Sequence, residues 1–456
     1  MRRTKIVATL GPSTDDAGSI GAVLEAGADV VRLNGAHGTP AFHTRVAELA
    51  RDAARGLGRT VGVLVDLPGP KLRVGEVPGD AVELAAGTTF TLASAGADPG
   101  GAGVSTNVPD LPALAGIGDP IWLADGEIVL TVRGVTAGGV VTEVVRGGTL
   151  RSRKGLALPG AEGTLDPFTP ADEQILDLAV RIGAELVGVS FVRAAADLHR
   201  VRAAAPGGPA APVLVAKIET RAALEHLDDI VAAADVVMVA RGDLGVQIDI
   251  ARTPLVQKEV IGRCNRAGRP VVTATQMLES MTRTPIPTRA EASDVANAVL
   301  DGSDALMLSE ETGVGAYPAD TVATMARLVE AAEAWQPPGR DVDRAGGDDS
   351  GPWDLAREAV AASTSTGAVA IVCRTGTGTT ARCLAALRPA VPVVAVTPTE
   401  RIAAQLAVVR GVVAVPAPGA GHDLGPIVAA ARASGAVGPG TAVAVLDGSV
   451  HVVPTI

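Results

Sequence analysis

A lysine and two acidic residues follow two successive stretches of sequence that are typical of buried parallel strands. Lys217 and Glu219 stand two residues apart at the end of the stretch VLVAKIE, so both side chains lie on one face of an extended chain. The next such stretch, VVMVA, runs directly into Arg241-Gly242-Asp243. Mg²⁺ is commonly held by one or two carboxylates and by oxygens of the substrate. We therefore expect Glu219 and Asp243 to share a divalent ion while Lys217 faces an anionic substrate beside it.

The same three residues are also compatible with a structural ion-pair network that closes one end of a sheet. A buried ion pair contributes little net stability, because desolvation of the two charges costs about as much as their attraction returns. This weakness favours the interpretation in which the cluster binds a metal and an anion.

The composition restricts the classes of protein to which the chain can belong. Its 456 residues are too many for a single ordinary core, and 47% are hydrophobic while only 2% are aromatic, which predicts cores of small and β-branched side chains. The net charge of −11 argues against nucleic acid or an anionic membrane surface as a partner. The three cysteines have no C-x-x-C spacing, and no run of about 18 apolar residues occurs. We therefore expect a cytoplasmic protein that does not span a membrane.

Apolar runs separated by helix-length segments predict the domain that positions these residues. Three runs precede residue 70 and five follow residue 171, which gives the eight strands expected of a (β/α)₈ TIM barrel. A doubly wound sheet is the structural alternative. Polar residues gather at the ends of the runs, and barrel enzymes place their chemistry at the carboxyl ends of their strands. The runs are residues 4–11, 28–34, 61–66, 185–192, 213–219, 236–243, 270–276 and 305–311.

The sequence between and after these runs predicts two further domains in this α/β fold. From residue 71 to 160, short alternating apolar stretches predict an antiparallel β-barrel domain inserted into the TIM barrel, which itself comprises residues 1–70 and 161–335. Residues 336–352 form a polar linker, and residues 353–456 have the pattern of a small α/β domain. A Gly-rich loop in that domain lies between a strand and a helix and suits a phosphate, although such a loop is more often only a turn.

Ten motifs occur along the chain in a characteristic order. They are TKIVATLGPS, VVRLN-x-x-HG, D-x-x-GPKLR, RKGLALPG, VSFVR, AKIE, MVARGDLGV, GRCNRAGRPVVTATQMLESM, PTRAEASDVANAVLDG and MLSEETGVGAYP. Together they resemble the pyruvate kinase family. The resemblance implies phosphoryl transfer from phosphoenolpyruvate to ADP, which gives pyruvate and ATP in the last step of glycolysis, with Mg²⁺ or Mn²⁺ and usually K⁺. It also implies a lid formed by the inserted domain, a C-terminal site for a sugar-phosphate or nucleotide effector, and a homotetramer.

Residue by residue, the resemblance assigns roles to the strand ends. Glu219 and Asp243 match the divalent-metal ligands, and Lys217 matches the lysine that neutralises charge as the phosphoryl group leaves the enolate. Thr275 matches the hydroxyl associated with protonating the enolate, and Gly242 matches a backbone amide offered to the substrate carboxylate. Cations placed on the transferring group would supply most of the catalysis, because phosphoryl transfer needs little covalent chemistry.

Other matched residues surround this cluster, although an isolated arginine or histidine would more often be structural. Arg32 and Arg73 match the arginines that face the phosphoryl group, and planar guanidinium groups suit phosphate oxygens. The residues that match the nucleotide site are Asn34, His37, Arg73 and, from the lid, Lys154 and Asp125. The residues that match the effector loop of regulated family members are Thr375, Thr377, Gly378 and Thr380.

The chain departs from the family pattern where the monovalent ion binds, a region that includes Asn34, Asp66 and Leu67. The family commonly has Asn-Phe-Ser-His-Gly where this chain has alanine at position 36, so a serine hydroxyl that ligates K⁺ is missing. The family commonly has glutamate where this chain has Lys71, and a potassium-independent branch carries lysine there. We therefore predict that Lys71 supplies a catalytic positive charge in place of K⁺ and that K⁺ is not required.

Two other functions compete with this interpretation. A barrel aldolase or lyase that acts on pyruvate would also use a Mg²⁺-bound enolate and Lys217, but it would need neither a lid nor a nucleotide. A non-catalytic paralogue that senses metabolites through its C-terminal domain predicts the loss of Lys217 or of a metal ligand, and all of these residues are present.

Overall fold

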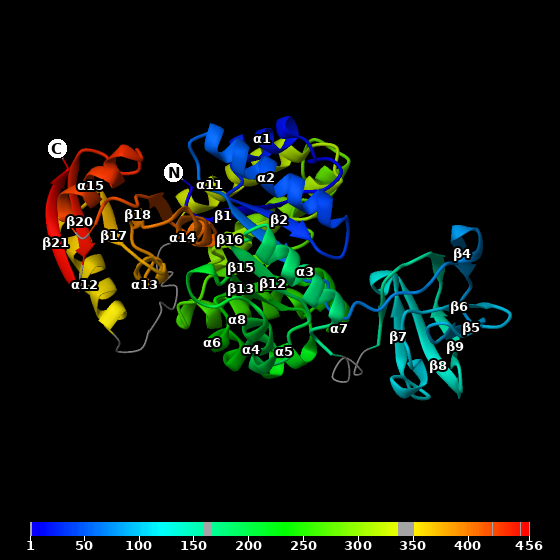
Figure 1. Ribbon diagram of the computed structural model, residues 1–456. Helices are drawn as coiled ribbons and strands as arrows, with labels where there is room; N and C mark the ends of the chain where they lie inside the picture. Colours follow the sequence, from blue (N-terminus) through cyan, green and yellow to red (C-terminus); the bar gives the residue numbers. More distant parts are fainter. Residues whose placement is uncertain (1, 159–165, 336–350, 422, 447, 456) are drawn as a thin grey trace.

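Eight parallel strands close into a barrel at the centre of the computed structural model (Figure 1). They follow one another in the order β1-β16-β15-β14-β13-β12-β3-β2, so the predicted TIM barrel is confirmed and the doubly wound sheet was the wrong alternative. Their bounds are β1 (Lys5–Thr9), β2 (Val30–Asn34), β3 (Gly62–Asp66), β12 (Leu186–Val189), β13 (Val213–Ile218), β14 (Val236–Ala240), β15 (Val271–Ala274) and β16 (Ala305–Leu308). The structure describes residues 2–158, 166–335, 351–421, 423–446 and 448–455.

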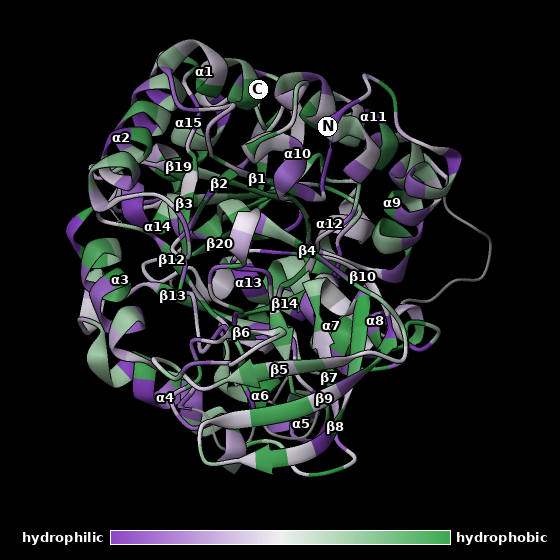
Figure 2. Ribbon diagram, turned by 90° about the vertical axis from the view of Figure 1, so that its right-hand side faces the viewer, coloured by the Kyte–Doolittle hydropathy of each residue, from purple (hydrophilic) through white to green (hydrophobic). Residues whose placement is uncertain are grey.

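Helices surround the barrel because each presents an apolar stripe to the strands. In α2 (Pro40–Gly56) the buried stripe includes Val46, Ala47 and Ala50. Threonine N-caps followed by proline fix the starts of α2 and α3 (Pro170–Arg181). Figure 2 shows the ring of helices from the side of the inserted domain. The other long barrel helices are α1 (Ala17–Glu25), α4 (Ala195–Ala204), α8 (Thr253–Arg266), α9 (Arg289–Asp301) and α11 (Pro318–Ala334).

The inserted domain is a separate β structure with its own core. Its larger sheet has the order β11-β7-β8-β9-β5-β6, and β10 pairs with β4. Alternate residues of β8 (Ile128–Thr136) point inward, as the sequence pattern predicts. One pair departs from the expected antiparallel pattern: β5 (Thr89–Ala93) and β6 (Gly103–Ser105) run parallel, because the chain crosses back between them. The remaining strands are β4 (Ala81–Leu84), β7 (Pro120–Leu123), β9 (Gly139–Arg146), β10 (Gly148–Arg151) and β11 (Leu156–Ala157).

The C-terminal domain is a five-stranded sheet of order β19-β18-β17-β20-β21 with helices packed on it. Four of its strands were expected; the fifth, β21, pairs antiparallel with β20 and was not predicted. The predicted linker lies outside the described residues except for 351 and 352, which begin α12, and the predicted boundary at residues 160 and 161 also lies outside them. The elements are α12 (Gly351–Thr366), β17 (Ala370–Arg374), α13 (Thr379–Ala386), β18 (Val393–Thr397), α14 (Glu400–Gln405), β19 (Val412–Pro416), α15 (Leu424–Ala433), β20 (Gly440–Leu446) and β21 (Ser449–Thr455).

The inserted domain and the C-terminal domain lie at opposite ends of the barrel (Figure 1). Val7 and Val30, from the barrel strands, share one apolar cluster with Ile402 and Leu406 of the C-terminal domain. The carboxyl ends of the strands therefore remain free to face the inserted domain. Within the described part of the chain, no helix combines the length and the apolar character needed to cross a membrane.

Candidate active site

Lys217 and Glu219 meet at the carboxyl end of β13, as their spacing predicts. Lys217 Nζ lies 2.8 Å from Glu219 Oε1, and both side chains are buried. The other carboxylate oxygen, Glu219 Oε2, accepts a hydrogen bond of 2.7 Å from the backbone N–H of Phe191. β13 pairs in parallel with β14, which leads into Asp243, so the three charged residues lie at one end of two neighbouring strands.

Lys217 is held by groups from two other strands. Its ammonium donates a hydrogen bond of 2.8 Å to Ser190 Oγ and lies 3.6 Å from Asp66 Oδ2. Burial alone would lower the pKa of Lys217, but the negative charges of Glu219 and Asp66 raise it well above its usual value. The side chain therefore carries a positive charge throughout the ordinary pH range.

Asp66 connects Lys217 to Arg32. Asp66 Oδ2 also accepts a hydrogen bond of 2.7 Å from Arg32 Nε, and Arg32 Nη1 donates to Thr9 Oγ1 at 3.1 Å. Burial opposes ionisation of Asp66, but the charges of Arg32 and Lys217 keep the pKa of this carboxyl below its usual value. One buried carboxylate thus fixes the positions of two cations.

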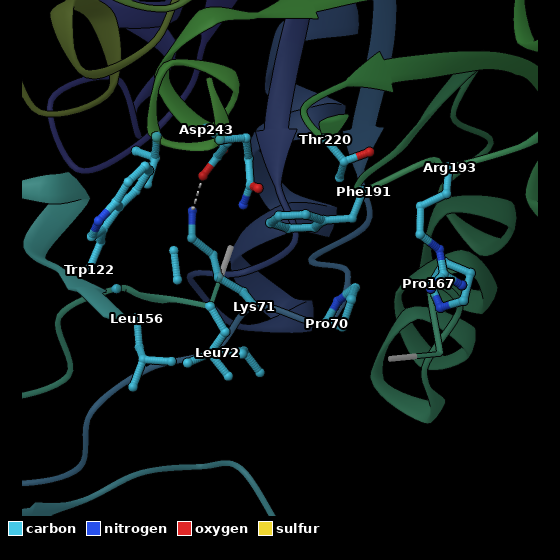
Figure 3. Close-up of a pocket in the computed structure, with 15 residues that line it drawn as sticks. Pro70, Lys71, Leu72, Trp122, Leu156, Pro167, Phe191, Arg193, Thr220 and Asp243 are labelled. Atoms are coloured by element: carbon cyan, nitrogen blue, oxygen red, sulfur yellow. Dashed lines mark ion pairs between the residues drawn. The ribbon is translucent and has the colours of Figure 1, made fainter. Parts of the chain in front are cut away.

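Asp243 lies in the first turn of the short helix α7 (Arg241–Gln247) and faces Lys71. Lys71 Nζ is 3.5 Å from Asp243 Oδ1, an ion pair that Figure 3 shows at the wall of a cleft between the barrel and the lid. Trp122, Leu72 and other apolar side chains line the lid side of this cleft. Lys71 therefore lies beside Asp243 at the wall of the open cleft.

Glu219 and Asp243 fit a divalent ion whose coordination is completed by a substrate. Burial raises the pKa of Glu219, and the nearby negative charge of Asp243 raises it further, while Lys217 opposes this effect. A dication between the two carboxylates would relieve that unfavourable charge. In the part of the chain that the structure describes, no three His, Cys, Asp or Glu side chains converge on a complete metal site. A divalent ion held here would take its other ligands from outside the protein, which is common for Mg²⁺.

Thr275 and Gly242 meet beside this cluster. Thr275 Oγ1 accepts a hydrogen bond of 2.8 Å from the backbone N–H of Gly242 and donates one of 2.6 Å to the carbonyl of Ala274. The N–H of Gly242, which the resemblance assigns to the substrate carboxylate, is therefore bonded to Thr275 in this structure. Thr275 has φ of 71°, in the left-handed region that is costly for a β-branched residue. Such strained residues concentrate at functional sites.

The residues that match the nucleotide site are spread more widely. Arg73 donates from Nη1 to the carbonyl of Arg153 in the lid at 3.0 Å, and Asn34 Oδ1 accepts from the N–H of Ala36 at 3.2 Å. Partial burial lowers the pKa of His37, and the positive charges of Arg73, Lys71 and Arg32 lower it further, so its ring is neutral at pH 7. Lys154 is exposed on the lid, and the side chain of Asp125 lies outside the described residues.

The loop that matches the effector site lies in the C-terminal domain, at the far end of the barrel from this cluster (Figure 1). Thr375 is buried and its N–H donates to the carbonyl of Val396 at 3.0 Å. Thr377 Oγ1 lies 2.9 Å from Thr379 Oγ1, and Gly378 has φ of 83°, which permits the tight turn into α13. Thr380 is the second residue of that helix.

Two serines at strand ends had no predicted role, and one of them, Ser190, belongs to the cluster. Ser190 contacts Lys217 and also donates to the carbonyl of Leu67 at 2.7 Å. Ser309 follows β16, and its buried Oγ has no hydrogen-bond partner among the described residues. Their place immediately after barrel strands was the only signal that could have identified them.

Comparison with known proteins identifies the family. The family model for the pyruvate kinase barrel domain matches residues 1–322, and the model for the pyruvate kinase alpha/beta domain matches residues 354–454. Pyruvate kinase of Thermococcus litoralis is 39% identical over 90% of this chain and 88% of the relative, and that of Mycobacterium intracellulare is 41% identical over 90% and 86%. The crystal structure of a pyruvate kinase from Cryptosporidium parvum has a TM-score of 0.89 at 32% identity and covers 100% of this chain and 96% of its own. The chain therefore belongs to the pyruvate kinase family.

Proposed function

We propose that this enzyme transfers the phosphoryl group of phosphoenolpyruvate to ADP at the cluster formed by Lys217, Glu219 and Asp243. The observation that supports this assignment is the close contact of Lys217 Nζ with Glu219 Oε1, at the strand end next to Asp243. A permanently charged ammonium beside two carboxylates can bind an anionic substrate together with a cation. The strongest competing function, a lyase, leaves the lid and the C-terminal domain without a role.

Glu219 and Asp243 would hold Mg²⁺ or Mn²⁺ in this enzyme. The bound cation would supply positive charge next to the oxygens of the phosphoryl group and of the enolate. The protein's own contribution is to hold both carboxylates in place. The N–H of Phe191 orients Glu219, and α7 orients Asp243.

Three side chains act on the reacting groups in this proposal. Lys217 neutralises the negative charge that develops as the phosphoryl group leaves the enolate, and Arg32 binds the phosphoryl oxygens. The hydroxyl of Thr275 lies beside the place where the enolate takes up a proton. The N–H of Gly242 would bind the substrate carboxylate once it is released from Thr275. Arg73, Asn34, His37 and, after the lid closes, Lys154 and Asp125 would surround the nucleotide.

We also propose that the enzyme works without K⁺. Each of the three residues of the monovalent-ion region has an oxygen engaged with a protein donor: Asn34 Oδ1 with the N–H of Ala36, the carbonyl of Leu67 with Ser190, and Asp66 Oδ2 with Arg32. Among the described residues, only the buried Asp66 Oδ1 of this set has no hydrogen-bond partner. Lys71 brings a tethered positive charge to the same end of the barrel, where it lies 3.5 Å from Asp243. A tethered cation needs no capture from solution.

Pyruvate release tests the reaction. Release from phosphoenolpyruvate should require both ADP and Mg²⁺. Release without ADP would favour the lyase, and no release under any condition would favour the non-catalytic sensor.

Exchange of the monovalent cation tests the role of Lys71. Turnover should change little between Na⁺ and K⁺ buffers of matched ionic strength, a control that is needed because salt screens the charges of the site. Lys71→Glu should lose activity, and the double variant Lys71→Glu with Ala36→Ser should recover part of it only in K⁺. Strong activation of the unmodified enzyme by K⁺ would contradict the proposal.

A phosphorylated effector is proposed for the loop of Thr375, Thr377, Gly378 and Thr380, because hydroxyls and amides converge before α13. A sugar phosphate or a nucleotide should shift the saturation curve for phosphoenolpyruvate, and Thr377→Glu should abolish that shift by repelling the phosphate. If none of these metabolites changes the curve, the loop is only a turn.

We further propose a cytoplasmic homotetramer. The three cysteines are buried and none of them forms a disulfide, which suits a reducing compartment. Ile250 and Leu255, at the start of the α8 region, expose 75% and 66% of their surface. Contiguous exposed apolar patches mark protein–protein interfaces, so we place the subunit contact here.

A further inference from the structure

The turn that carries Lys71 is fixed to its surroundings at several points. The N–H of Leu67 donates to the carbonyl of Gly188 at 2.8 Å, and the carbonyl of Leu67 accepts from Ser190 Oγ at 2.7 Å. Two residues later, Gly69 has φ of 66°, and its carbonyl accepts from the N–H of Lys71 at 2.8 Å. The direction in which Lys71 leaves the turn therefore depends on how Gly69 is held.

Gly69 is held by a carboxylate from a distant part of the sequence. Asp172, in the first turn of α3, accepts a hydrogen bond of 2.7 Å from the N–H of Gly69 through Oδ1, across 103 residues of sequence. Its Oδ2 accepts from the N–H of Thr169 at 2.7 Å and from Thr169 Oγ1 at 2.6 Å. Asp172 is completely buried, which is rare for aspartate unless every oxygen has a partner.

The space around Gly69 shows that the contact is tight. A Cβ atom at this position would lie 2.6 Å from Cδ2 of Phe191 and 3.0 Å from Cβ of Ser190. The turn is therefore enclosed between the carboxylate of α3 on one side and the end of β12 on the other. Among the described residues, only Asp172 accepts a hydrogen bond from the N–H of Gly69. Movement of Asp172 would therefore release that side of the turn.

We propose that Asp172 is a positioning residue for Lys71. By holding the N–H of Gly69, it directs the turn so that the ammonium of Lys71 reaches Asp243. Asp172 also connects the segment that enters the lid to the helix that follows the lid, so the same hydrogen bond fixes the base of the lid. This inference rests on the proposed catalytic role of Lys71.

The competing explanation is that Asp172 only caps α3. Thr169 offers a control, because Thr169→Ala removes the capping hydroxyl, which accepts from the N–H of Asp172 at 3.2 Å and donates to Asp172 Oδ2 at 2.6 Å. The acceptor for Gly69 stays in place, and the N–H of Thr169 still holds the carboxylate. Asp172→Ala removes the acceptor for Gly69, whereas Asp172→Asn keeps a carbonyl oxygen there only by turning its NH₂ group toward the N–H of Thr169.

Hydrogen exchange of the segment 67–71 and steady-state kinetics test the proposal on the intact enzyme. Without substrates, Asp172→Ala should speed amide exchange in this segment, Asp172→Asn should speed it less, and Thr169→Ala should leave it close to that of the unmodified enzyme. Asp172→Ala should lower kcat by about tenfold to a hundredfold, the range expected for a misplaced catalytic group, with a smaller change in KM. In a Lys71→Met background, Asp172→Ala should cause no further loss of kcat.

If Asp172→Ala does not fold, Asp172→Ser serves instead, because its hydroxyl can cap Thr169 but is too short to reach Gly69.

Two results would overturn the proposal. Equal effects of Thr169→Ala and Asp172→Ala on exchange and on kcat would make Asp172 only a helix cap. A full additional loss from Asp172→Ala in the Lys71→Met background would show that it does not act through Lys71. Failure of the proposed function is distinguishable from both, because Lys71→Met by itself would then keep full activity.

Discussion

One buried carboxylate organises the charges of the site. Asp66 Oδ2 lies 2.7 Å from Arg32 Nε and 3.6 Å from Lys217 Nζ, so both cations are fixed before any substrate binds. Charges that are already oriented stabilise a transition state without reorganisation during the reaction. Lys217 has a further contact with Glu219, which links the cation to the proposed metal ligand. The chemistry of each side chain thus depends on its neighbours as much as on its type.

Lys217→Met should abolish most of the phosphoryl transfer while substrate binding stays largely intact. The ammonium matters most when negative charge builds on the departing enolate, and loss of one such group typically lowers turnover by about a hundredfold or more. Lys258→Met is the control, since Lys258 lies on the outer helix α8 and forms an ion pair with Asp301 of α9. Steady-state kinetics with both variants give the answer, and turnover of Lys217→Met within a few fold of the unmodified enzyme would refute the assignment.

Strands and the turns that follow them bring these side chains together. Asp66 is the last residue of β3, Ser190 follows β12 and Lys217 lies in β13. These three strands are adjacent in the barrel. The close fit between β3 and β12 depends on Gly188, because a Cβ atom there would lie 1.9 Å from Asp66 Oδ1. A strand position without a side chain therefore makes room for the carboxylate that holds Arg32 and Lys217.

Gly188→Ala should displace the carboxylate of Asp66 and lower both activity and stability. The added Cβ atom would clash with the buried carboxylate of Asp66, which Arg32 and Lys217 hold from two sides. This carboxylate cannot move aside as a flexible side chain would. Gly21→Ala in α1 is the matched control, because a Cβ atom there meets nothing within 4 Å and alanine favours a helix by about 0.5–1 kcal/mol. Turnover and the temperature of thermal unfolding should both fall for Gly188→Ala and should hold or improve for Gly21→Ala. Equal behaviour of the two variants would show that β12 can shift away from Asp66.

For the whole molecule, the base of the barrel and the C-terminal domain form one continuous structure. Lys5 Nζ donates to the carbonyl of Val412 at 2.9 Å, and Arg401 donates to the carbonyls of Gly183 and Ala184 at 3.1 and 3.0 Å. These contacts leave the opposite end of the barrel to the lid (Figure 1). The proposed catalytic and effector sites are therefore separated by the full barrel.

Arg388→Ala should destabilise this junction. Arg388 Nη1 lies 3.1 Å from Asp304 Oδ1, and Nη2 donates to the carbonyl of Gly302 at 2.8 Å. Removing one partner of a buried ion pair leaves an unpaired charge and typically costs about 3–5 kcal/mol. Urea unfolding measures the loss. The control Arg55→Ala, which breaks an exposed pair with Asp52, should have no measurable effect; equal stability of both variants would show that Asp304 finds another partner.

Leu255→Glu should dissociate the proposed homotetramer, because a charge in an apolar interface must be desolvated without a partner. Light scattering after size-exclusion chromatography measures the mass. Ile117→Glu is the control, since Ile117 is 73% exposed on the lid, away from the barrel surface. A tetramer that survives Leu255→Glu would place the interface elsewhere.

The sequence by itself determined the features that depend on local spacing. Alternation and apolar runs gave the barrel strands, and the two-residue spacing of Lys217 and Glu219 put their side chains on one face, because an extended chain repeats every two residues. The family motifs are also contiguous stretches, so they could be read without a structure.

Only the tertiary structure decided which distant residues touch. The bonds of Lys217 to Ser190, of Gly242 to Thr275 and of Asp172 to Gly69 each join different elements. Their geometry depends on the register of neighbouring strands and on how α3 packs after the lid, and no local pattern encodes either one. The strand β21 escaped prediction for a related reason: its alternating residues are mostly exposed, so only pairing with β20 makes it a strand.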